Sequence, residues 1–411
     1  MTVSGFKKIT SGRFDLKTIG IGLTGICAFL SLYATQPLLP HLEELFHASK
    51  VAVSLTVSAA TLAVALSAPW MGLFADKKGR KKVIVPALCL MGVANLLTAT
   101  ATTLPALIAW RFLQGLLTPA VFAVAVAYVN EEWPKERVGF ATSVYVTGTI
   151  IGGFSGRFLS GLTASIFGWR GVFLVLGALI LLLTWGISTW LPLAKQFKKV
   201  SDYRVGLRNM ADHLRNPDLL MIYAVGFVLL FSLVGTFTYI TFYLAAPPFN
   251  LGPSALGSLF FVYLMGAVIT PLVGSRVDRL DGKKTLALSL STSALGVCLT
   301  LIPNLPCIIF GIALCSSGVF VCQVLTNQRV GAVAGKSRAL AIGLYVAFYY
   351  AGGCVGSIAP GFLWDWDGWK ACVALIAGLL ILTAGFILVS WREKHLSGSH
   401  AGEGKGLGLP G

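Results

Sequence analysis

The sequence predicts an all-α membrane protein whose twelve transmembrane helices form two six-helix bundles related by a pseudo-twofold axis. Three observations predict this fold. The mean hydropathy is +0.80 and only 12% of the 411 residues are charged, which excludes a soluble protein. The apolar residues fall into runs of about 20, long enough to cross roughly 30 Å of hydrocarbon as helices. The second half of the chain also repeats motifs of the first half.

The apolar runs can be placed in order along the chain. In the first half we expect helices over residues 19–40, 51–73, 83–103, 107–130, 139–162 and 171–192. In the second half we expect helices over residues 219–245, 255–275, 285–303, 307–330, 339–362 and 371–391. The first run follows basic residues, as the apolar core of a signal peptide does. It lacks a small-residue cleavage motif, so we interpret it as a retained helix.

The polar segments divide the chain into an N-terminal bundle (1–192), a cytosolic linker (193–218), a C-terminal bundle (219–391) and a cytosolic tail (392–411). Within the linker, Leu207, Met210 and Leu214 recur at helical spacing among basic residues. This pattern is equally typical of a short helix on the membrane surface and of a flexible charged linker.

The formal net charge of +16 follows membrane topology rather than nucleic-acid binding. Of the 32 lysines and arginines, 27 lie in the two ends and in the alternate loops that share their side of the membrane. This distribution is the positive-inside bias. It predicts cytosolic N- and C-termini and a bacterial inner-membrane location. The expected partners are membrane lipids and a small-molecule substrate, with no nucleic acid, and the chain is expected to be a monomer.

The sequence carries no motif for metal, cofactor or catalytic chemistry. The eight cysteines lie in or beside apolar runs without forming a CxxC pair, and the five histidines are scattered over loops and the tail. Neither GxxxxGK[ST] nor HExxH occurs. We therefore expect no metal site, no cofactor and no enzyme activity.

The two halves resemble each other at a shift of 200 residues. Matching positions include Tyr145, Gly152, Gly153, Gly156, Gly168 and Trp169 with Tyr345, Gly352, Gly353, Gly356, Gly368 and Trp369. The loop Gly72–Lys82 (GLFADKKGRKK) returns as Gly274–Lys284 (GSRVDRLDGKK), with Asp278 at the place of Asp76. Both copies are predicted to be cytosolic, so the repeats share one orientation and are related by an axis along the membrane normal.

The loop Gly72–Lys82 resembles the signature loop of the major facilitator superfamily, G-x3-D-x2-G-R-x-[KR]-[KR], at Gly72, Asp76, Gly79 and Arg80. The resemblance covers essentially all the predicted helices. It implies a secondary transporter of the twelve-helix drug and metabolite proton-antiporter branch. The end of the first predicted helix, YATQPLLPHLEELF, also resembles sugar and arabinose efflux permeases.

This resemblance implies a conformational latch at the signature loop. Asp76 would cap the positive N-terminal end of the eleventh predicted helix, in the opposite bundle. Glu131 and Glu132 are the expected partners of Arg80, and Asp278 marks the equivalent loop in the second half. The alternative is a basic loop that only sets topology.

Two arginines lie inside predicted helices, where each costs at least about 2.5 kcal/mol unless it faces the protein interior or water. Arg111 and Gln114 form an R-x-x-Q-G pattern that resembles the family's fourth-helix motif, which implies a role in proton coupling. The alternative for Arg111 is snorkelling to the outer interface. Arg157 either binds an anionic substrate group or snorkels in the same way.

Closely spaced glycines in the fifth and eleventh predicted helices are expected to let helices approach at the seam between the two bundles. They are Gly148, Gly152, Gly153 and Gly156 and, in the repeat, Gly352, Gly353 and Gly356. The first set resembles the family's exporter motif, G-x3-G-P-x2-G-G. It departs from that motif because Gly153 replaces the proline and Arg157 replaces the last glycine.

Tyrosine hydroxyls and side-chain amides within lipid need hydrogen-bond partners, so some should face an internal substrate cavity. Our candidates are Tyr33, Gln36, Tyr239, Gln323, Asn327, Tyr345 and Tyr349. A wider aromatic set on the same helices includes Tyr223, Phe231, Tyr243, Tyr263 and Tyr350. Core packing is the alternative role for each.

All sixteen acidic residues lie in predicted loops or at helix ends, so no mid-membrane carboxylate is present to carry a proton. We predict alternating-access export of a small organic solute, a drug-like molecule or a metabolite, with proton antiport left open. Import of a nutrient or organic anion is the main alternative. A membrane receptor or assembly protein that does not transport is an alternative of another class.

Overall fold

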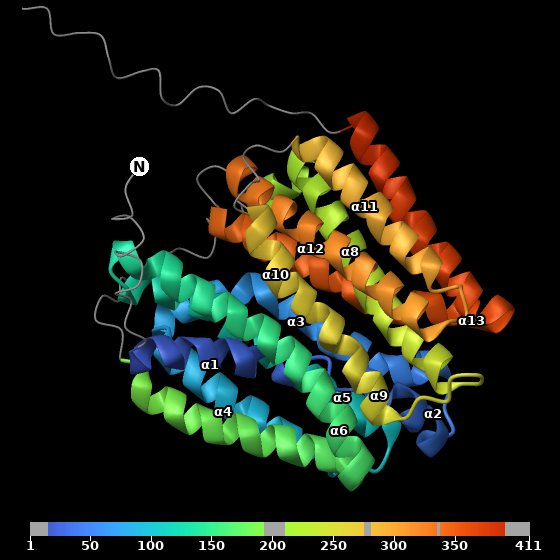
Figure 1. The fold of residues 1–411 in the computed structure, drawn as a ribbon. Helices are drawn as coiled ribbons and strands as arrows, with labels where there is room; N and C mark the ends of the chain where they lie inside the picture. Colours follow the sequence, from blue (N-terminus) through green and yellow to red (C-terminus); the bar gives the residue numbers. More distant parts are fainter. Residues whose placement is uncertain (1–14, 193–209, 275–280, 335–337, 391–411) are drawn as a thin grey trace, which may run out of the picture.

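The computed structural model describes residues 15–192, 210–274, 281–334 and 338–390, and every regular element in these ranges is a helix (Figure 1). The N-terminal half contains α1 (Leu16–Leu30), η2 (Gln36–Leu38), α2 (Leu39–Phe46), α3 (Lys50–Lys78), α4 (Lys81–Thr98), α5 (Leu104–Glu132) and α6 (Lys135–Trp190). The C-terminal half contains α8 (Pro217–Ala245), α9 (Pro253–Ser258), η3 (Leu259–Val262), α10 (Tyr263–Gly274), α11 (Gly282–Leu299), α12 (Leu305–Val333) and α13 (Arg338–Ser390). In Figure 1, α1, α4 and α6 lie on one side of the molecule and α8, α11 and α13 on the other.

Within the described ranges, seven helices are long and apolar enough to cross a membrane. They are α3, α4, α5, α6, α8, α12 and α13. Shorter apolar helices cover Leu16–Leu30 and Pro253–Gly266. The helical membrane fold predicted from hydropathy is thereby confirmed.

Two helices are far longer than one membrane crossing, and both break at a repeat-related glycine. α6 has 56 residues and loses helical geometry at Gly168, where φ is 70°. α13 has 53 residues and breaks at Asp367 and Gly368, where φ of the glycine is 55°. Glycine adopts positive φ without the Cβ clash that other residues suffer. The matched pair in the sequence therefore marks matched kinks in the chain.

The first predicted helix, 19–40, is shorter in the structure than the sequence indicates. α1 ends at Leu30, and the chain passes through a turn into η2 and then α2. Pro37 and Pro40 lie at the starts of these two short elements, because proline lacks an N–H and suits the first turn of a helix rather than its interior.

The closely spaced glycines pack inside each half rather than at the seam between the halves. A Cβ on Gly152 would lie 2.8 Å from Cα of Ile26, and one on Gly156 would overlap the carbonyl oxygen of Leu30, so α6 packs directly on α1. In the repeat, a Cβ on Gly352 would lie 2.8 Å from Cα of Phe227 on α8. The prediction for these glycines was therefore wrong in location, although the close approach itself occurs.

The seam between the halves is formed by other close contacts. A Cβ on Gly257 of α9 would lie 3.0 Å from the carbonyl oxygen of Arg157 and 3.1 Å from Cα of Gly161, so α9 and α6 meet backbone to backbone. On the neighbouring helices, the hydroxyl of Ser58 on α3 lies 3.0 Å from the Cys354 sulfur on α13. The two halves are thus in direct contact where α9 meets α6 (Figure 1) and also between α3 and α13.

Some predictions fall outside the described residues. They include residues 193–209 of the linker with Leu207, the tail 392–411 and Asp278. Met210 and Leu214 lie in a helical stretch over residues 210–215.

Candidate functional site

Arg157 projects from α6 into the seam, and only 3% of its surface is exposed. Its guanidinium carbon lies 4.3 Å from the ring centroid of Tyr33, 4.9 Å from that of Phe260 and 4.8 Å from that of Tyr263. Two of these rings belong to the opposite half, on η3 and α10. Cation–π contacts stabilise a guanidinium that has lost water. Arg157 is therefore held within the protein and does not extend to a membrane surface.

Gln36 connects Arg157 to the C-terminal half. Its side-chain oxygen accepts a hydrogen bond of 2.8 Å from Nε of Arg157, and its amide nitrogen donates one of 3.2 Å to the Thr238 hydroxyl on α8. Gln36 is fully buried at the start of η2, where the broken first helix places it. One polar chain therefore runs from α6 through η2 to α8 across the seam.

Several donors in this cluster have no hydrogen-bond partner in the described parts of the chain. Arg157 donates from Nε to Gln36 and from Nη1 to the Gly153 carbonyl at 2.5 Å, which leaves Nη2 without such a bond. Within the same ranges, no ion pair reaches its guanidinium. The hydroxyls of four buried tyrosines around it also form no hydrogen bond with a described residue. They are Tyr33, Tyr263, Tyr349 and Tyr350, which all lie within electrostatic range of Arg157.

We name this group of residues, Tyr33, Gln36, Arg157, Phe260, Tyr263, Tyr349 and Tyr350, the seam cluster. It draws on both halves, and it combines one cation, aromatic faces and unpaired donors. Such a combination suits the binding of an anionic or hydrogen-bond-accepting group between the halves.

Arg111 is fully buried and binds carbonyls at the end of α1. Its Nη1 donates to the Ser31 carbonyl at 2.8 Å, Nη2 donates to the Leu32 carbonyl, and Nε donates to the Thr56 carbonyl at 3.3 Å. The carbonyls at the end of a helix lack intrahelical partners and carry partial negative charge. Arg111 satisfies them where α1 stops, so it does not snorkel to an interface.

Gln114 completes the environment of Arg111. Its side-chain oxygen accepts a hydrogen bond from Nη1 of Arg111, and its amide nitrogen donates one of 2.9 Å to the Thr98 hydroxyl on α4. The R-x-x-Q spacing places both side chains on one face of α5. Together they tie α5 to α1, α3 and α4.

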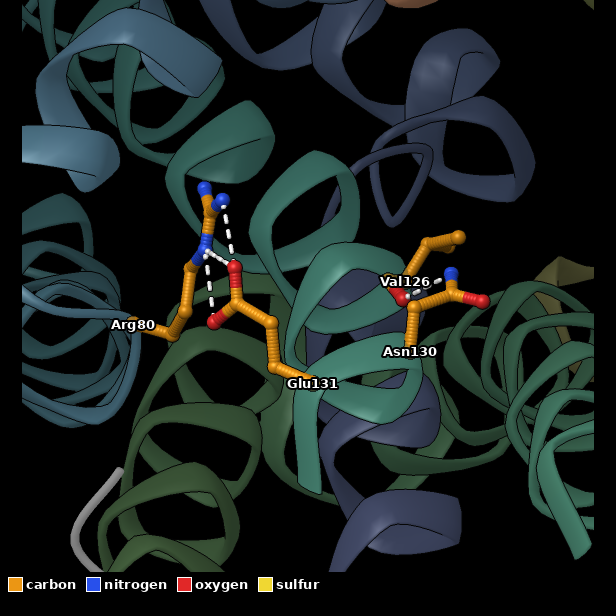
Figure 2. Close-up of polar contacts among 4 residues, drawn as sticks. All are labelled: Arg80, Val126, Asn130 and Glu131. Carbon is orange, nitrogen blue, oxygen red and sulfur yellow. Dashed lines mark hydrogen bonds and ion pairs between the residues drawn. The ribbon is translucent and has the colours of Figure 1, made fainter. Parts of the chain in front are cut away.

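The signature loop contributes one described ion pair. Nη2 of Arg80 lies 2.9 Å from Oε1 of Glu131, and Nε donates to both carboxylate oxygens at 3.1 and 3.3 Å, as Figure 2 shows. The sequence predicted this partner correctly, but the pair joins α4 to α5 inside the N-terminal half. Glu132 instead accepts a bond of 2.6 Å from Nζ of Lys17 at its backbone carbonyl.

The remaining residues of the signature loop are described only in part. Gly79 ends α3 with φ of 90°, a conformation that glycine adopts easily. Gly72 and Asp76 lie in α3, while the side chain of Asp76 lies outside the described parts of the chain. The latch between the halves therefore stays a prediction.

Other candidates from the sequence are dispersed. Tyr239 donates a hydrogen bond of 2.9 Å to the Ser357 carbonyl and ties α8 to α13, and Tyr345 pairs with the Thr326 hydroxyl at 2.9 Å. Tyr345 also stacks 6.0 Å from Tyr349, at the edge of the seam cluster. Gln323 is half-buried and Asn327 is exposed, and neither reaches Arg157 among the described contacts.

Sequence reasoning missed Phe260 and Thr238 as members of the site. Phe260 lies three residues before Tyr263, so both fall on one face of a helical segment and could have been paired on that spacing. Thr238 gave no such signal, because threonines are common in the interior of membrane helices as packing residues.

Comparisons with known proteins agree with this architecture. The family model described as Major Facilitator Superfamily matches residues 21–248 and 244–409. An uncharacterized transporter of Buchnera aphidicola subsp. Schizaphis graminum is 31% identical over 94% of both chains. The inner membrane transport protein YnfM of Escherichia coli is 30% identical over 92% of this chain and 91% of its own.

Solved structures share the fold at low sequence identity. The nucleoside transporter NupG matches with a TM-score of 0.77 and 14% identity, over 91% of this chain and 100% of its own. The human organic anion transporter MFSD10 matches with a TM-score of 0.66 and 19% identity, over 90% of this chain and 99% of its own.

Proposed function

Because the chain belongs to the Major Facilitator Superfamily, we propose that it is a secondary transporter that exports a small organic solute by alternating access. The observation that supports this proposal is the seam cluster, in which Arg157, Gln36 and buried tyrosines of both halves meet. A solute bound between two bundles can be exposed to either side when the bundles rock against each other. The solute is a metabolite or drug-like molecule.

The proposal includes twelve membrane crossings. α6 and α13 each make two crossings, separated by the kinks at Gly168 and Gly368, and α9 with α10 makes one. α1, α3, α4, α5, α8, α11 and α12 make the others. With the basic loops inside, both termini are cytosolic in a bacterial inner membrane. The bundles are residues 1–192 and 219–391, joined by the linker 193–218.

Export is proposed because the glycine pattern on α6 resembles the exporter motif. The test is counterflow of candidate solutes in proteoliposomes with the protein in a known orientation. Efflux from the cytosolic to the outer side supports the proposal. Uptake in the opposite direction would favour the alternative, an importer of a nutrient or organic anion. Absence of flux for every solute that binds would favour a receptor that has kept this fold.

Proton antiport is a second part of the proposal. No carboxylate lies at the middle of a predicted span, so the proton carriers would be groups at the helix ends, such as Glu43, Asp76, Glu131 and Asp365. Solute efflux should accelerate when a pH gradient, acid outside, is imposed. If the efflux rate changes neither with the pH gradient nor with a protonophore, proton antiport is rejected and facilitated diffusion is the remaining mechanism.

The signature loop supplies a test of the latch. Replacing Asp76→Asn keeps the shape of the side chain but removes its negative charge. We expect transport to fall by up to about thirtyfold, since a charged cap contributes up to about 2 kcal/mol, while membrane insertion is unchanged. Glu136→Gln, which removes a carboxylate at the start of α6, is the matched control. Full transport activity of Asp76→Asn would show that the charge of Asp76 is not needed and that the loop only sets membrane topology.

A further inference from the structure

We infer that the transported solute is an aromatic monocarboxylate whose carboxylate binds Arg157 between the two halves. This inference rests on the proposed transport function and adds the chemical class of the substrate. The seam cluster carries it, because its charge, its rings and its unpaired donors all point to one kind of ligand.

The charge of the cluster selects an anion. Arg157 is 3% exposed, and no carboxylate of the described ranges pairs with it. A buried, unpaired guanidinium is costly in a membrane protein, and a ligand carboxylate would remove that cost through charge-assisted hydrogen bonds. The same charge repels organic cations. Nη2 still lacks a described partner and is the donor that such a carboxylate would take.

The number of cations limits the ligand to one negative charge. Among the arginines that the structure describes, Arg111 is the other buried one, and its donors are taken by the carbonyls of Ser31, Leu32 and Thr56 and by Gln114. A dicarboxylate or a phosphate dianion would therefore leave one charge uncompensated in a low-dielectric site.

The rings around Arg157 favour an aromatic body. Phe260 and Tyr263 lie 5.8 Å apart, and Tyr349 and Tyr350 lie 5.6 Å apart. Offset and edge-to-face ring pairs contribute about 0.5–1.5 kcal/mol beyond the burial of their area. The tyrosine hydroxyls, unpaired among the described residues, add donors for the second carboxylate oxygen. A sugar would instead require a ring of amide and carboxylate acceptors, and Gln36 already bonds to Arg157 and Thr238.

The test measures binding to the purified full chain in lipid nanodiscs. The probes are benzoate, 2-naphthoate and indole-3-acetate, each compared with its uncharged carboxamide by calorimetry or thermal shift. We expect at least one carboxylate to bind about tenfold or more tightly than its amide, as charge-assisted hydrogen bonds predict. Equal affinity for acid and amide, or no binding of any of the three acids, would overturn the inference.

Variants assign the preference to Arg157. Arg157→Gln should abolish the preference for acid over amide, and Arg157→Lys should keep part of it because lysine has the charge without the planar fork. Arg170→Gln is the control, because Arg170 is exposed, stacks on Trp169 and lies two residues after the kink at Gly168. This variant should keep the full preference for acid over amide. If Arg157→Gln does not fold, Tyr349→Phe combined with Tyr350→Phe should weaken acid binding by several fold. An unchanged preference in either variant contradicts the inference.

These experiments distinguish failure of the proposed transport function from failure of the inference about the ligand. A carboxylate preference that depends on Arg157, without flux in proteoliposomes, would retain the inference on ligand class and reject transport. Flux of a solute without that preference would retain transport and reject the monocarboxylate.

Discussion

At the residue scale, the two buried arginines have different neighbours and therefore different expected roles. Arg111 donates to backbone carbonyls at the end of α1 and on α3, whereas Arg157 contacts rings and an amide at the seam. The sequence predicted that both would lie in membrane helices and left their roles open. Their roles could not be derived from the sequence, because the carbonyls that accept from Arg111 lie at the end of α1 and on α3, more than 50 residues away in the chain.

This difference predicts the effect of replacing Arg111. Arg111→Lys keeps the charge, but a lysine cannot donate to several carbonyls at once. Each hydrogen bond to a charged group contributes about 1.5–3 kcal/mol. The loss of two such bonds should therefore lower the stability of the folded protein by about 3 kcal/mol or more. The measurement is the melting temperature of purified protein. Arg137→Lys, at an exposed salt bridge with Asp15, is the control with little expected effect. An unchanged melting temperature with uncoupled transport would support a direct role in proton coupling instead.

At the element scale, the same helix packing occurs in both halves. α6 packs on α1 as α13 packs on α8, and the close approaches at Gly156 and at Gly356 involve the backbone of Leu30 and of Phe231. The glycine spacing in the sequence predicted close helix approach, but at the seam between the halves. It could not predict that the partner is the first helix of the same half, because the spacing defines one face of a helix and not the neighbour that this face meets.

The repeat predicts how sensitive these glycines are. Gly156→Ala should destabilise the protein by about 1–3 kcal/mol or prevent folding, since the new methyl group would overlap the Leu30 carbonyl. Gly139→Ala, on the same helix with nothing within 4 Å of the added Cβ, should be neutral or stabilising by up to about 1 kcal/mol. Fluorescence-detected size-exclusion chromatography after heating measures both. Equal behaviour of the two variants would contradict the described packing.

The contact between α3 and α13 predicts a reversible lock. Ser58 Oγ and Cys354 Sγ lie 3.0 Å apart, so Ser58→Cys places two thiols where a disulfide of about 2.05 Å can form. Oxidation should reduce transport at least about tenfold, because the halves can no longer separate, and a reductant should restore it. Ser58→Cys with Cys354→Ala is the control and should not respond. A cross-linked protein that transports at full rate would show that this contact does not open.

At the scale of the whole molecule, the sequence predicted the helical membrane fold because the apolar runs and the repeated motifs extend over the entire chain. It placed Tyr33, Gln36, Arg157 and Tyr349 among the candidates, and the structure brings these together at the seam. It also proposed Tyr239, Gln323 and Asn327, which are not part of the seam cluster. The distinction depends on the rotation of each helix about its own axis, which uniformly apolar helices do not encode in their sequence pattern.

The proposed mechanism requires the contact between α6 and α9 to open while the opposite side closes. Spin labels would report this motion by pulsed electron resonance in a cysteine-free background. One pair of labels is placed on Thr102 and Ile302, which are exposed in the loops with few basic residues, one in each half. A second pair on Asn130 and Gln328, exposed near the basic loops, reports the other side. We predict that 2-naphthoate redistributes the two distances in opposite directions. A single distance for each pair, unchanged by ligand in protein that binds it, would contradict alternating access.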